Sequence, residues 1–98
     1  TFCRILLYMQ EDFFMENQET RIAVIGIIID DRNQAEAVNT LLSQYGQYVI
    51  GRMGLPYEKK QVNIISIVVD APMDAISALS GKLGRLPGVS SKALYSKA

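Results

Sequence analysis

Two nearly unbroken runs of β-branched residues dominate the hydrophobic pattern of the chain, and they match each other at an offset of 40 residues. Residues 21–31 (RIAVIGIIIDD) align with residues 61–71 (QVNIISIVVDA), so that Ile27 matches Ile67 and each run reaches an aspartate. Continuous apolar runs of this length are typical of strands covered on both faces. The repeat predicts two central strands of one sheet.

A helical pattern follows each predicted central strand. Asp31 and Gln34 form a candidate capping box before the first helix, which Gly46 ends. The second helix ends at Pro87 and Gly88, which favour a turn. Apolar residues at helical spacing define the buried stripes, namely Ala35, Val38, Leu41, Leu42 and Tyr45 in the first helix and Met73, Ile76, Leu79, Leu83 and Leu86 in the second.

Each helix is followed by a weaker strand pattern. Residues 47–55 contain Gly51 and Gly54, and residues 89–96 are interrupted by serines and a lysine. Such strands are favoured at sheet edges, where packing demands are lower. Right-handed crossovers then give an α+β fold of βαββαβ, ferredoxin-like topology: a four-stranded antiparallel sheet with two helices on one face.

The second face of this sheet needs another cover. Neighbouring residues of a strand point to opposite faces, so apolar side chains at successive positions cannot all lie under the helices. A partner chain or the apolar N-terminal segment would cover them, and we expect a homo-oligomer, a dimer or a tetramer. The candidate interface residues are Ile25, Ile27, Ile29, Ile50 and Met53.

Composition fits a single domain. The chain has 98 residues, of which 49% are apolar and 20% charged, and no linker divides it. We assign residues 15–98 to the domain. Residues 1–14 form an N-terminal extension, native or not, ahead of Met15, and they lack the cleavage site of a signal peptide.

Net charge and hydropathy exclude two classes of partner. Ten basic and ten acidic residues cancel, so no overall field attracts nucleic acid. The apolar runs are far shorter than the roughly 20 residues of a membrane span. We expect a cytoplasmic protein that contacts neither DNA nor membrane directly.

The chain offers little catalytic chemistry. It has no histidine and one cysteine, Cys3, so we expect no metal site, no cofactor and no enzymatic activity. Asp30, Asp31 and Asp70 lie at strand ends, where helix capping explains them better than catalysis does. Two glycines inside the second helix, Gly81 and Gly84, favour close packing on the sheet over contact with a ligand.

The loop after the first strand is the best candidate for a ligand site. A helix N-terminus supplies unpaired amides, and Arg32 can grip a carboxylate. The candidate residues are Asp31, Arg32, Asn33 and Arg52. Their ligand would be a small anionic or amino-acid-like effector, while the alternative is a solvated, capped turn.

The chain resembles the iron-only hydrogenase system regulators, small ACT-like proteins similar to the C-terminal domain of nickel-responsive regulators. The resemblance rests on VIGIIIDDRNQAEAVNTLLSQYG, VIGRMGLPY and, most specifically, AISALSGKLGRLPGV (residues 75–89). It implies a homo-oligomeric regulator. Nickel binding does not carry over, because the matching region has neither histidine nor cysteine, and neither does the DNA-binding ribbon-helix-helix domain.

Three functions remain open at this point. The first is a ligand-sensing or protein-binding regulator, and the second a structural oligomerisation subunit. The third is a small enzyme, because this fold hosts many unrelated activities.

Overall fold

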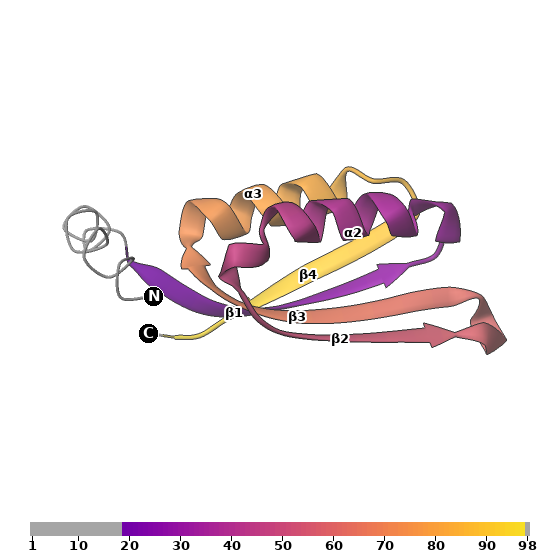
Figure 1. Ribbon diagram of the computed structural model, residues 1–98, viewed down its shortest axis with the longest axis horizontal. Helices are drawn as coiled ribbons and strands as arrows, with labels where there is room; N and C mark the ends of the chain where they lie inside the picture. Colours follow the sequence, from indigo (N-terminus) through magenta and orange to yellow (C-terminus); the bar gives the residue numbers. More distant parts are fainter. Residues whose placement is uncertain (1–18, 98) are drawn as a thin grey trace, which may run out of the picture.

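The computed structural model describes residues 19–97 and shows one sheet and two helices (Figure 1). The proposed extension, residues 1–14, lies outside the described residues. Three short 3-10 helices, Arg32–Gln34, Gly46–Tyr48 and Glu58–Lys60, occupy the connections. The main elements are β1 (Thr20–Ile29), α2 (Ala35–Gln44), β2 (Val49–Tyr57), β3 (Val62–Pro72), α3 (Met73–Gly84) and β4 (Val89–Tyr95).

The sheet has the order β2-β3-β1-β4, and every neighbouring pair is antiparallel. Both helices lie on the same face of it (Figure 1). The two repeated segments are the central strands and the two weaker segments are the edges. The predicted α+β, ferredoxin-like βαββαβ fold is confirmed.

The core lies between the sheet and the helices. On β1 the odd-numbered residues from Ala23 to Ile29 are buried, and on β3 those from Ile65 to Ala71. Three side chains assigned to the oligomer interface, Ile25, Ile27 and Ile29, are fully buried there, so that assignment was wrong. Both faces of β1 are apolar, and the pattern did not show which face the helices cover.

The helices contribute most of the predicted stripes to this core. Val38 and Leu42 of α2 and Ile76, Leu79 and Leu83 of α3 are buried. Met73, at the start of α3, is 41% exposed and lies outside the core.

The predicted packing of the α3 glycines on the sheet was wrong. Gly81 and Gly84 are exposed, and a Cβ added at Gly84 would meet nothing within 4 Å. They lie on the face of α3 that turns away from the sheet. Neither helix of the described region is long and apolar enough to cross a membrane.

Candidate functional site

The face of the sheet opposite the helices is apolar and exposed in the described chain. Its exposed large side chains range in exposure from 39% for Val24 to 71% for Leu94, while Val62, Ile64 and Val68 on β3 are half-buried. Strand alternation and register define this helix-free face. It comprises Ile22, Val24, Gly26 and Ile28 on β1; Gly51, Met53, Leu55 and Tyr57 on β2; Val62, Ile64, Ser66, Val68 and the exposed Asp70 on β3; and Ser90, Lys92 and Leu94 on β4.

Two of the predicted interface residues, both on β2, are exposed. Met53 is 57% exposed and pairs with Ser66 on the helix-free face. Ile50 is 63% exposed and lies at the irregularity in β2 where the register with β3 shifts.

A shallow hollow of about 410 Å³ lies within the helix-free face. Gly26, on the central strand β1, pairs with Ser66 on one side and Lys92 on the other. The small residues Gly26 and Ser66 form the floor, and Ile28 and Ile64 lie beside it. A Cβ added at Gly26 would meet nothing within 4 Å, so packing inside the monomer does not require a glycine there.

The loop after β1 is held by internal contacts. A side-chain oxygen of Asp31 accepts a 3.0 Å hydrogen bond from the backbone amide of Asn33, so Asp31 is a capping residue. Both terminal nitrogens of Arg32 lie 3.4 Å from the carboxylate of Glu58. The buried Nε of Arg32 has no hydrogen-bond partner.

The turn before β4 closes over the same loop. The carbonyl oxygen of Gly88 accepts hydrogen bonds from the amides of Asp30, at 2.7 Å, and Asp31, at 3.3 Å. Gly88 has a φ of +73°, and a Cβ there would lie 2.6 Å from the Cβ of Asp31. Only glycine allows this approach.

The four predicted ligand residues do not meet in one cavity. Arg52 reaches from β2 to α2, where it donates a 2.6 Å hydrogen bond to the side-chain oxygen of Asn39, and it lines a depression of about 170 Å³. Asn33 lines a different hollow between the helices. Asp31 and Arg32 take part in the loop contacts described above.

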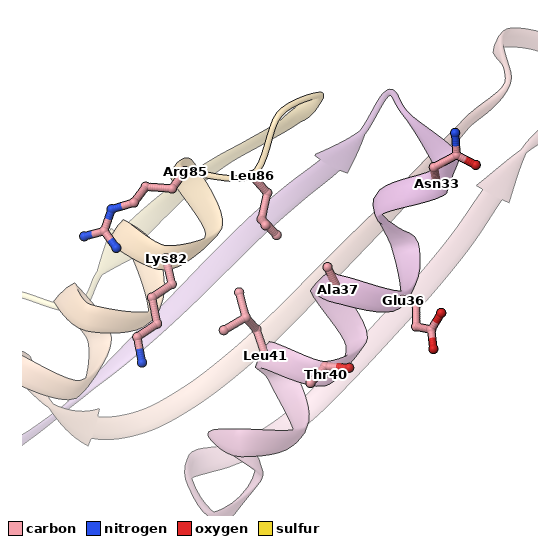
Figure 2. A pocket seen from close by; sticks show the side chains of 8 residues that line it. All are labelled: Asn33, Glu36, Ala37, Thr40, Leu41, Lys82, Arg85 and Leu86. Carbon is pink, nitrogen blue, oxygen red and sulfur yellow. The ribbon is translucent and has the colours of Figure 1, made fainter.

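The hollow that Asn33 lines is an inter-helix groove of about 590 Å³ between α2 and α3. Figure 2 shows Leu41 and Leu86 pointing into the space between the helices, with Lys82 and Arg85 on the α3 side. The Nζ of Lys82 lies 5.2 Å from the centre of the Tyr45 ring, which suits a cation–π contact. The other lining residues are Glu36, Ala37 and Thr40.

The two cations of the inter-helix groove were missed by the sequence analysis. Lys82 and Arg85 are three positions apart in the chain, a spacing that places side chains on one helix face. That spacing was the available signal. The guanidinium of Arg85 points away from α2 (Figure 2), so an apolar floor with the cation of Lys82 beside it can accept an anion that also carries an apolar part.

Acidic and cysteine side chains do not gather in the described region. Among residues 19–97, no group of three or more histidine, cysteine, aspartate or glutamate residues is placed to hold a metal ion.

Comparison with known proteins identifies one family. A family model described as "TM1266-like: Iron-only hydrogenase system regulator, putative" matches residues 21–93. A solved structure, that of the uncharacterized protein TM1266 from Thermotoga maritima, is 36% identical with a TM-score of 0.77. The match covers 81% of this chain and 100% of that chain. No curated protein matches.

Proposed function

Since the chain belongs to the TM1266-like family of iron-only hydrogenase system regulators, we propose that it is a small regulatory protein that acts by binding and self-association. The observation that carries this proposal is the exposed helix-free face. Catalysis is not part of the proposal, because the chain has no histidine and its loop carboxylate Asp31 is engaged in capping.

Self-association would use the helix-free face. Each 100 Å² of apolar surface removed from water is worth about 2.5 kcal/mol, and monomers rarely leave a contiguous patch of several hundred Å² exposed. The exposed side chains of β1 are flanked by β4 on one side and by β3 on the other, with β2 beyond β3. A homo-oligomer with closed two-fold symmetry, a dimer or a dimer of dimers, would bury this surface.

Light scattering after size exclusion tests this step. The full-length protein at tens of micromolar is expected to be a dimer or tetramer. Val24→Glu places a charge on the helix-free face and is expected to dissociate the oligomer. Ala78→Glu, on the exposed side of α3, is the matched control and is expected to leave it intact.

A monomeric wild-type protein would refute self-association. If the oligomer persists in Val24→Glu, the contact lies on another surface, such as the edge strand β2.

We propose the inter-helix groove, rather than the β1–α2 loop, as the site for a small anionic or amino-acid-like effector. The groove has space, an apolar floor and the cation Lys82, with Arg85 at its rim, whereas Arg32 is paired with Glu58. A ligand that binds only the native state raises the unfolding temperature by mass action.

A thermal-shift screen of amino acids, nucleotides and other carboxylates tests the effector site. An active compound is expected to lose its effect in Lys82→Ala and Arg85→Ala but to keep it in the control Lys59→Ala. If no compound shifts the unfolding temperature while the oligomer is confirmed, the alternative function gains support, namely a structural or protein-binding subunit.

A further inference from the structure

The helix-free face has a shape that fits a second copy of itself. Its hollow, at Gly26 and Ser66, lies directly beside a ridge made by Ile28 and Ile64. Gly26 pairs with Ser66 and Ile28 pairs with Ile64, so hollow and ridge form two adjacent rows across the central strands. We infer that two copies pack face to face with the Ile28 ridge of each seated in the Gly26 hollow of the other, an inference that rests on the proposed self-association.

Gly26 is the main evidence for this contact between two copies. Glycine inside a strand weakens it and often marks the close approach of another molecule. Gly26 is in the middle of the central strand β1, where no atom of the described chain lies within 4 Å of its missing side chain. The space above Gly26 is therefore free for a side chain from outside.

Two-fold symmetry makes the contact reciprocal. If the axis crosses the strands midway between the Gly26 and Ile28 rows, Ile28 of each copy meets Gly26 of the other, and Ile64 meets Ser66 in the same way. Lys92, which is level with Gly26 on β4, then lies over Ser90 of the second copy and not over a second lysine.

The same axis produces a further match on β2 that was not used to place it. Leu55 is level with Ile64 and Met53 with Ser66, so the axis passes midway between Met53 and Leu55. Rotation about this axis places Tyr57 of one copy opposite Gly51 of the other. A Cβ at Gly51 would make only ordinary contacts with Val68, at 4.0 Å, so the monomer does not require a glycine here either.

The area of the face suits a stable dimer. The four strands have 10, 9, 11 and 7 residues, and at about 3.3 Å per residue and about 4.8 Å between strands they cover roughly 600 Å² as a flat surface. A standard interface buries about 800 Å² of accessible surface on each partner. A second copy therefore uses most of the face.

Exchanging ridge and hollow tests the inference. Gly26→Ile is expected to raise the dimer dissociation constant about tenfold to a hundredfold, because the added side chain occupies the seat of Ile28. Ile28→Ala is expected to weaken the dimer as well. The double variant Gly26→Ile with Ile28→Ala moves the ridge to the hollow and is expected to recover at least about tenfold over Gly26→Ile alone.

Gly54→Ile is the matched control. Gly54 is also a strand glycine with open space, but it pairs with the buried Ile65 and so faces the helix side of the sheet. This variant is expected to dimerise like the wild type. Circular dichroism and thermal unfolding of every variant in monomeric solution confirm that the fold is retained.

The possible outcomes separate this inference from the proposed function. A wild-type monomer overturns both. A full-length monomer that dimerises once residues 1–18 are removed overturns the inference, because that segment then covers the face. If Val24→Glu dissociates the dimer but Gly26→Ile does not, or if the double variant recovers nothing, self-association stands and the seating of Ile28 on Gly26 is wrong.

Discussion

The backbone amide of Asp30 donates a 2.7 Å hydrogen bond to the carbonyl oxygen of Gly88, which ties the loop after β1 to the turn before β4. This contact joins the end of β1, in the first repeat, to the turn between α3 and β4, in the second repeat. It depends on the absence of a side chain at Gly88, whose position over Asp31 leaves no room for one. The glycine is therefore a structural requirement of the fold.

Gly88→Ala is expected to destabilise the protein by about 2–4 kcal/mol. A left-handed conformation costs a non-glycine residue about 1–2 kcal/mol, and the new Cβ would displace Asp31 as well. Urea unfolding measures the loss. Gly84→Ala, at the end of α3 with open space around it, is the control, and a similar loss there would contradict the explanation.

Gly81→Ala is expected to stabilise the protein by about 0.5–1 kcal/mol. Gly81 is exposed in α3, and the nearest atom to an added Cβ is the flexible end of Arg85, at 4.0 Å. Alanine therefore gains helix propensity without a clash. A destabilised variant in thermal unfolding would show that another molecule or segment packs against this helix face.

Arg32→Ala is expected to cost less than about 1 kcal/mol and to leave the fold intact. The ion pair with Glu58 is long, at 3.4 Å, and the Glu58 side chain is 75% exposed, so solvent screens it. Glu58→Gln should have an equally small effect in the same urea titration. A loss above about 2 kcal/mol from Arg32→Ala alone would give the guanidinium a structural role beyond this pair.

The purified, tag-free protein is expected to contain no stoichiometric transition metal. The chain offers one thiol and no imidazole, which are the ligands that such metals prefer. Elemental analysis gives the direct measurement. One nickel, zinc or iron per chain would contradict the expectation.

The strands and their order could be predicted because local patterns determine them. The repeated β-branched runs identify β1 and β3, and serine and glycine identify the edges. Which face of β1 the helices cover could not be predicted, because Val24 and Ile25 are equally apolar and only the position of the helices distinguishes them.

The candidate site was predicted only in part. Asp31 and Asn33 could be located from capping chemistry, and the structure places them in a capped turn. The groove between α2 and α3 depends on how two helices lie against each other, which the local sequence around Lys82 and Arg85 does not specify. The Gly26 hollow and the Ile28 ridge depend on the register between β1 and β3. This register pairs Gly26 with Ser66 and Ile28 with Ile64.

The strand order also constrains how this protein can fold. Each strand of the first repeat pairs only with strands of the second: β2 with β3, and β1 with β3 and β4. A nascent chain that ends after β2 has therefore formed none of its sheet. Because the pairings of β1 with β3 and β4 are distant in sequence, the loop-closure entropy must be overcome before these contacts form, and folding should be slow and should begin only once β3 has been made. Until β3 emerges from the ribosome, the β-branched strand β1 has no strand to pair with, and its apolar side chains favour aggregation.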